Sequence, residues 1–130
     1  MNIDNLQILE VEDPPTNNQE IENAEKSIDR VLPNVYKQFL ILTNGAIMNN
    51  CVLYSIDRIV SVDDIYNMKK YAPQYICIGN NNGDYELVME AKEEAVICSF
   101  IDSGSIGVIK PRKWFNFEQW IDKGCPINLE

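Results

Sequence analysis

The stretch IGNNNGDYEL, residues 78–87, decides how the middle of this chain folds, because three asparagines and a glycine there separate two hydrophobic runs. A phosphate-binding loop would need a helix after its glycines, so that backbone amides converge on the anion. Alternating strand residues follow instead, and the stretch holds no lysine. A calcium loop of the helix–loop–helix type would place Ile78 and Met89 at its ends, and neither side chain can bind a cation.

A β-hairpin explains the same stretch better. Asn82-Gly83 is a dipeptide that tolerates positive φ at both central positions of a tight turn. Pairing of the flanking strands would place one set of side chains on a common face: Ile76, Ile78, Tyr85, Leu87 and Met89. The opposite face would then carry Tyr75, Cys77, Asp84, Glu86, Val88 and Glu90. We therefore expect a hairpin with one apolar face and one acidic face.

Two helices are expected before this hairpin. Residues 1–15 read as a loosely ordered lead-in, after which Thr16 or Asn17 caps a helix, with Gln19 or Glu20 completing a capping box. The segment LPNVYKQFLILTNG, residues 32–45, predicts a second helix. Pro33 suits its first turn, and Gly45 suits the left-handed conformation that ends it.

Strand material follows around an Asn49-Asn50 turn, in residues 51–56 and 58–60, and Ser61 or Asp63 could then cap a short helix that reaches residue 71. Further strands are predicted over residues 74–79, 84–90, 95–101 and 106–109, and a last helix over residues 116–124. The order predicts one α+β domain over residues 1–130, with a mainly antiparallel sheet, two N-terminal helices, one middle helix and one C-terminal helix.

The composition narrows the classes of function. The chain has no histidine, which excludes catalysis by a Ser-His-Asp or Cys-His group and histidine metal ligands. A net charge of −9 disfavours binding to nucleic acid or to an anionic membrane, and it favours basic partners. On charge alone, a plain role in keeping the protein soluble is the simpler explanation. No apolar run is long enough for a membrane helix, and the N-terminus lacks a signal-peptide pattern, so we expect a cytoplasmic protein.

The cysteines and the basic aromatic segment favour structural roles. The four cysteines are widely spaced, without a C-x-x-C pair, so reduced buried thiols are expected rather than a zinc site, and no cofactor is predicted. The segment KPRKWFNFEQW, residues 110–120, has only three cations, and its aromatic side chains have core-packing spacing.

The acidic face of the hairpin is the candidate partner-binding surface. Asp84, Glu86 and Glu90 alternate with the apolar side of their strand and would point away from the core. Asp63 and Asp64 are further candidates, although one of them could be a helix cap. Two alternatives remain open for these carboxylates. They could be merely solvated, or a helix could cover this face and pair them.

The chain resembles the SUKH superfamily, which includes the yeast cell-wall-assembly regulator and many bacterial immunity proteins. The resemblance spans about residues 18–124 and rests on fold signatures in order: Leu32, Pro33, Tyr36, Phe39, Leu40, Asn44, Gly45, Gly79, Gly83, Phe117 and Trp120. The chain departs from many members at Asn80, Asn81 and Asn82, where Gly-Gly or an acidic residue is common. None of the matched residues is catalytic.

What this resemblance implies is a non-catalytic protein-binding domain. The first hypothesis is an immunity protein that neutralises a cognate polymorphic toxin, which would be basic if it is a nuclease, because a nuclease must hold phosphate. The second is a stand-alone regulatory scaffold like the fungal relatives. The third is a hydrolase that uses a pair of carboxylates, and no motif in the sequence selects it.

Overall fold

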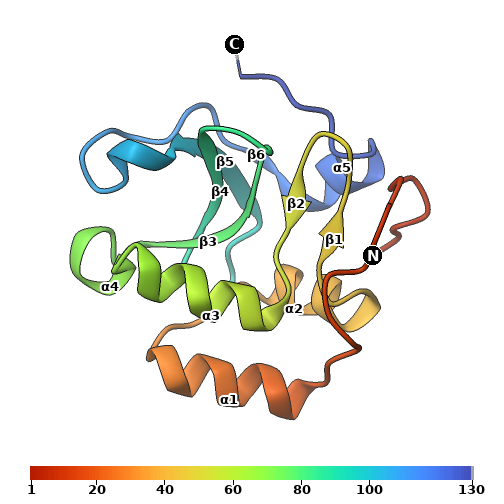
Figure 1. Ribbon diagram of the computed structural model, residues 1–130, viewed down its shortest axis with the longest axis horizontal. Helices are drawn as coiled ribbons and strands as arrows, with labels where there is room; N and C mark the ends of the chain where they lie inside the picture. The colour runs from red at the N-terminus through yellow and green to blue at the C-terminus, as the bar shows by residue number, and fades with distance from the viewer. Residues whose placement is uncertain (130) are drawn as a thin grey trace.

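The computed structural model describes residues 1–129 and has the predicted α+β architecture. Its six strands form one antiparallel sheet in which every strand pairs with its neighbours in sequence (Figure 1). The strands are β1 (Ala46–Ile47), β2 (Val52–Leu53), β3 (Tyr75–Asn80), β4 (Tyr85–Glu90), β5 (Ile97–Asp102) and β6 (Phe115–Asn116). The helices are α1 (Asn18–Ile28), α2 (Asn34–Leu42), α3 (Ile56–Ile65), α4 (Met68–Tyr71), α5 (Phe117–Asp122) and the 3-10 turn η1 (Ser103–Ser105).

The two N-terminal helices lie where the sequence predicts them. The side chain of Asn17 accepts a hydrogen bond from the Glu20 amide at 2.9 Å, which fixes the start of α1. Pro33 precedes α2, and its fixed φ suits that position. Gly45 does adopt a left-handed conformation, with φ of 86°, but two residues beyond the Thr43 cap of α2.

The core forms where α2 and α5 pack against the sheet. The rings of Tyr36 and Phe39 lie 5.5 and 6.0 Å from the ring of Phe117, and all three side chains are fully buried. The Tyr36 hydroxyl lies 2.6 Å from the carbonyl oxygen of Tyr54 and 3.0 Å from that of Ile78, so the polar end of this ring also has partners. The core-packing role predicted for the aromatic side chains of residues 110–120 is therefore confirmed for Phe117.

The N-terminal segment differs from the loose lead-in that we expected. The Leu9 amide donates to the Ile47 carbonyl at 2.9 Å, and the Ile47 amide donates to the Glu10 carbonyl at 2.8 Å. The Asp13 amide donates to the Asn44 carbonyl at 3.1 Å. These bonds hold the segment along the outer edge of β1, where strand amides would otherwise lack partners.

The middle helix begins earlier than predicted. Ser55 caps α3 by accepting a bond from the Arg58 amide at 3.1 Å, so a cap at Ser61 or Asp63 is wrong. The β-branched residues after Ser55 suggested a strand, but Ile56, Ile59 and Val62 are buried at helical spacing. In Figure 1, α3 lies between α1 and β3, and it packs against both.

The hairpin forms as predicted, with a different turn and a bulge. Cys77 pairs with Val88 and Gly79 pairs with Leu87, so Ile78 is an extra residue in β3. Of the two central residues predicted for the turn, Asn82 has positive φ, at 60°, whereas Gly83 does not. The bulge shifts the pairing of the two strands by one residue beyond Ile78.

Both faces of the hairpin are covered, because four residues in the middle of β3 and four in the middle of β4 are buried. The expectation that Glu86 points away from the core is therefore wrong, and the alternative of a covering helix fits this residue. The predicted strand over residues 106–109 is also wrong. That segment is a turn in which Val108 is 87% exposed.

Candidate functional site

A pocket of about 300 Å³ lies between α3, the β3–β4 turn and η1. Here α3, the helix that covers this face of the hairpin, does not close over the sheet completely. Its wall combines polar groups from three separate parts of the chain with the apolar side of α3: Tyr54, Arg58, Val62, Tyr66, Asn80 and Glu86. Arg58, Val62 and Tyr66 share one side because they are four residues apart along a helix.

Glu86 lies at the bottom of this pocket and is only 4% exposed. The Tyr54 hydroxyl lies 2.9 and 2.7 Å from the two carboxylate oxygens, and Tyr66 lines the same pocket. Asn80 donates from Nδ2 to the Tyr54 hydroxyl oxygen at 3.0 Å, which orients that hydroxyl toward Glu86. Burial raises the pKa of Glu86, and the two tyrosine hydroxyls oppose part of this shift. A buried carboxylate is thus held in place by a neutral donor.

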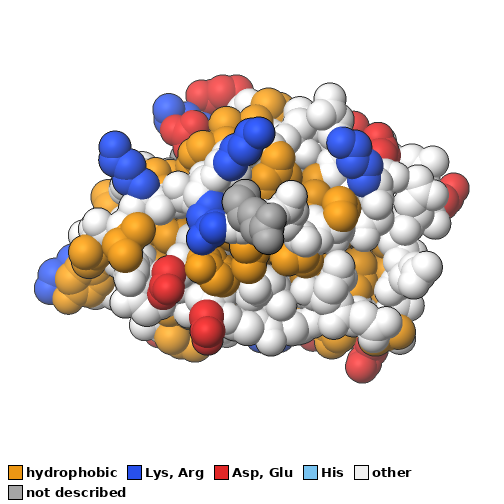
Figure 2. Space-filling model, turned by 90° about the horizontal axis from the view of Figure 1, so that it is seen from above, with side chains coloured by type: hydrophobic (Ala, Val, Ile, Leu, Met, Phe, Trp, Pro, Cys, Tyr) orange, Lys and Arg blue, Asp and Glu red, His pale blue; other side chains and the backbone are white. Residues whose placement is uncertain are grey.

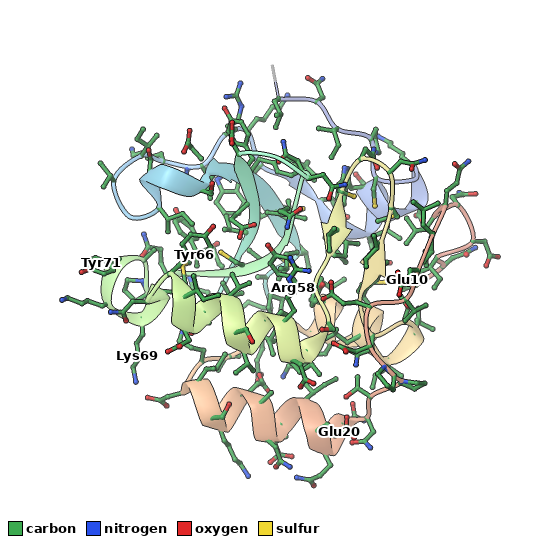
Figure 3. The ribbon with its side chains drawn as sticks, viewed as in Figure 1. Glu10, Glu20, Arg58, Tyr66, Lys69 and Tyr71 are labelled. Carbon is green, nitrogen blue, oxygen red and sulfur yellow. The ribbon has the colours of Figure 1, made fainter. Side chains whose placement is uncertain are left out.

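Arg58 stands at the rim rather than inside the pocket. Its Nη1 atom lies 2.9 Å from Oε2 of Glu12, and its guanidinium carbon lies 4.9 Å from the centre of the Tyr54 ring. Figure 3 shows Arg58 and Tyr66 near the two ends of α3, so they mark opposite ends of the pocket. Among the ion pairs within residues 1–129, none includes Glu86.

Asp63 and Asp64 do not join this pocket. Asp63 is buried, and one of its oxygens lies 3.1 Å from Nη1 of Arg30. Arg30 also donates to the carbonyls of Pro73 and Tyr75, so the pair joins the end of α1 to α3 and β3. Burial raises the pKa of Asp63. The positive charge of Arg30 opposes this rise, and the negative charge of Asp64 adds to it. Asp64 itself is exposed.

Asp84 and Glu90 lie on either side of Glu86 along the chain, and they point elsewhere. Asp84 is exposed in the turn next to Gly83, and its carbonyl accepts a bond from the Ser103 amide at 2.8 Å. Glu90 ends β4, four residues or about 13 Å beyond Glu86. It lies 3.4 Å from the Lys92 ammonium. Of the five predicted residues, only Glu86 reaches the pocket.

Sequence reasoning missed most of the pocket residues. Tyr54, Arg58, Tyr66 and Asn80 were not among the candidate residues. The available signal was the helical spacing of Arg58, Val62 and Tyr66, which the β-branched residues between them obscured. Asn80 was considered only as part of a turn.

The surface charges are separated along the molecule. Residues 4–29 contain eight acidic side chains and one lysine, and they form the lead-in and α1. Residues 103–117 contain Lys110, Arg112 and Lys113 and no acidic side chain. In Figure 1 the lead-in lies at the right and α1 along the bottom, whereas residues 103–117 run from the left side over the top to β6, and Figure 2 shows lysine and arginine side chains on the face seen from above. Glu10 and Glu20 mark the acidic side in Figure 3.

The cysteines form no metal centre in the described part of the chain. All four thiols are free and buried, and no group of three or more cysteine, aspartate or glutamate side chains within residues 1–129 is arranged to hold an ion. Within the same residues, no helix has the length and apolar character needed to cross a membrane.

Comparison with known proteins agrees with the topology. A search of curated proteins finds no match to the chain. The sequence profile of the SMI1 / KNR4 family (SUKH-1) matches residues 15–123, which include every helix and strand of the structure except the N-terminal bridge at Glu10. Since this match covers most of the chain, the protein belongs to the SMI1 / KNR4 family (SUKH-1).

Proposed function

We propose that this chain is a non-catalytic immunity protein that binds and neutralises a cognate toxin domain, and that this domain is basic and of the nuclease type. Membership of the SUKH-1 family supports a role in the immunity and regulator group in general. The specific proposal goes further, and it is carried by the charge of the surface.

The acidic surface is the observation that favours a basic partner. Acidic residues outnumber basic residues by twenty to eleven, and the excess is concentrated on the lead-in and α1. A nuclease must present cations to phosphate, so an acidic protein can approach the same surface and occupy it. The exposed residues Asp64 and Asp84 and the half-buried Glu90 add negative charge elsewhere on the surface, and we propose that they contribute to this attraction.

The pocket chemistry supports binding rather than turnover. Glu86 is held by Tyr54, and the sequence has no imidazole that could act with it as a second acid or base. Asp63, the other buried carboxylate, is occupied by Arg30. A mechanism with two carboxylates facing each other across a cleft therefore has no support from these two residues.

The test is protection followed by direct binding. The toxin domain encoded beside this gene would be expressed from an inducible promoter in cells with and without this chain. Survival that requires this chain, together with a stable complex of the two purified proteins, is the expected result. An unaffected loss of viability and no complex would reject the proposal. The absence of any toxin gene beside this one would instead favour a regulatory scaffold.

A further inference from the structure

Two carboxylates are buried in this structure, and they differ in how their charge is compensated. Asp63 has the guanidinium of Arg30 at 3.1 Å. Glu86 has no cation within ion-pair distance among residues 1–129, although it is 4% exposed. Buried charges in proteins are normally paired, because removing an ion from water is costly. An unpaired carboxylate that faces an open pocket therefore marks a place where a cation is missing.

The hydrogen bonds of Glu86 leave room for such a cation. A carboxylate offers about four lone-pair positions. The Tyr54 hydroxyl has a single proton to share between the two oxygens, and even a Tyr66 hydroxyl turned toward the carboxylate would occupy only one further position. At least two acceptor positions are therefore free. Asn80 orients Tyr54, so the carboxylate is fixed before any ligand arrives.

The walls of the pocket suit the side chain of arginine or lysine. The volume of about 300 Å³ accommodates a guanidinium or ammonium group with part of its aliphatic stem. The side chains of Val62 and Ile65 line the pocket, and Ile65 is 75% exposed at its mouth. Tyr54 and Tyr66 offer aromatic rings, which attract cations to their faces. Apolar walls for the stem and a carboxylate at the bottom match a long cationic side chain.

Arg58 is the one cation at the rim, and its geometry shows that the position over the Tyr54 ring already accepts a guanidinium. It is held away from Glu86 by Glu12, at 2.9 Å. Because it remains close enough to lower the pKa of Glu86, it should also repel a second cation that enters the pocket.

We propose that the pocket formed by Tyr54, Tyr66, Asn80 and Glu86 receives an arginine or lysine side chain of the protein partner. This inference rests on the proposed function for the identity of the partner, and it adds the contact that anchors it. Glu86 forms the ion pair, the two tyrosines flank the cation, and Arg58 tunes the affinity by repulsion. The acidic surface then provides attraction at long range, and this pocket provides specificity.

The first experiment uses small probes and does not depend on a toxin. N-acetyl-arginine methylamide and its lysine counterpart would be titrated into the labelled full-length protein, with the tyrosine and Glu86 signals followed by NMR. The matched control is the citrulline analogue, which has the shape of arginine without its charge. We expect the cationic probes to shift the signals of the pocket residues and the citrulline probe to have little effect. Equal shifts with citrulline, or no shift at tens of millimolar arginine probe, would overturn the proposal.

Variants of the protein show where the probe binds and whether the pocket favours a positive charge. Glu86→Gln keeps the shape of the side chain and should lower the affinity for the arginine probe on the order of tenfold or more. Glu94→Gln removes an equal charge from the exposed turn after β4, outside the pocket, and should change the affinity much less. Arg58→Gln should strengthen binding of the cation. If Arg58→Gln weakened binding of the cationic probe instead, Arg58 would be supporting the site and not repelling the cation, and that part of the proposal would be wrong. Circular dichroism of each variant would check that the fold is retained.

Binding of the toxin domain to the wild-type protein and to the same variants tests this inference separately from the proposed function. If the toxin domain binds the wild-type protein and Glu86→Gln equally well, the function stands and the pocket contact is refuted. If no toxin domain binds but the arginine probe does, the pocket stands and the proposed function fails. Loss of toxin binding in Glu86→Gln with retention in Glu94→Gln would support both.

Discussion

Gly79 in β3 lies against Val52 in β2 so closely that a Cβ atom on Gly79 would overlap the Val52 carbonyl oxygen. Its φ is not in the left-handed region, so the constraint is space and not backbone conformation. Since the obstacle is backbone, no side-chain rearrangement can relieve it. We expect Gly79→Ala to lower the free energy of unfolding by roughly 1–3 kcal/mol, as overpacking does.

Gly83 provides the matched control. A Cβ there would meet only the Asn81 side chain, at 3.4 Å, and Gly83 does not have positive φ. Gly83→Ala should therefore change stability by no more than about 0.5 kcal/mol. Denaturant unfolding of both variants would decide this. Equal losses would show that the Asn-rich turn, and not the contact with β2, limits the hairpin.

Asp63→Ala should be strongly destabilising, because it leaves the guanidinium of Arg30 buried without its partner. Breaking a buried ion pair in this way typically costs about 3–5 kcal/mol. The neighbouring exposed carboxylate offers the control, and Asp64→Ala should cost no more than about 0.5 kcal/mol. Thermal melts of the two variants would measure the difference. Similar midpoints would mean that water reaches Arg30 easily.

The stability of the protein should depend on pH through Glu86. Its pKa is raised in the folded state, so the folded protein holds this proton more tightly than the unfolded chain does. The contribution of Glu86 to stability is therefore largest below its unfolded pKa of about 4.3 and falls as pH rises through the higher folded value. The advantage of Glu86→Gln over the wild type should grow across that range and then level off.

Urea unfolding at a series of pH values between 4 and 8, spaced by about half a unit, would measure this trend. Tyr54→Phe is the informative companion variant, because it removes a hydrogen bond that lowers the pKa of Glu86. In that variant the fall in stability should continue to higher pH. Parallel curves for the wild type and Glu86→Gln would contradict the expected linkage.

The exposed and the buried carboxylates should affect binding kinetics differently. Under the proposed function, Asp84→Asn with Glu90→Gln should lower the association rate with the toxin domain, most strongly at low salt, because screening shortens steering to about 8 Å near physiological ionic strength. Glu86→Gln should mainly raise the dissociation rate. Surface plasmon resonance at low and high salt would separate the two. An association rate indifferent to salt and to the double change would exclude these residues from the steering surface.

The thiols should be unreactive in the folded protein. All four cysteines are buried, and burial raises the pKa of Cys77 and Cys98, which leaves little thiolate at neutral pH. We expect negligible labelling by a thiol reagent until denaturant is added, and then labelling of four thiols per chain. Protein purified without added metal should contain far less than one zinc per chain. Rapid labelling of the folded protein or stoichiometric zinc would overturn this reading.

The elements that the sequence predicted well are those specified by local chemistry. Asn17 and Pro33 mark helix starts through their own side chains, and the turn between β3 and β4 has residues that favour a turn in any context. The stretch from Ile56 to Val60 was misread because β-branched residues suit both a strand and a buried helix face. Packing against the neighbouring sheet decides between a strand and a helix here, and this packing involves residues that are distant in the sequence.

The candidate site depended even more on distant contacts. Glu86 alternates with apolar neighbours, so an outward direction follows from the sequence, and its burial requires knowing that α3 crosses that face. Its partner Tyr54 is 32 residues away along the chain. The bulge at Ile78 likewise shifts the pairing by one residue without an obvious mark in the sequence. The sequence therefore predicts the acidic character of the hairpin, but it does not predict the burial of Glu86 or the bulge at Ile78.

The hydrogen bonds between the N-terminal segment and Ile47 also limit how a partner can attach. Many recognition domains accept a peptide as an extra strand along an open sheet edge. In the described part of this chain, one edge is occupied by residues 9–13, and the other is β6, only two residues long. Few backbone groups at the sheet edges are therefore free to pair with an added strand, and a partner must be recognised through side chains. Selectivity of that kind can diverge between related chains by single substitutions while the scaffold stays unchanged.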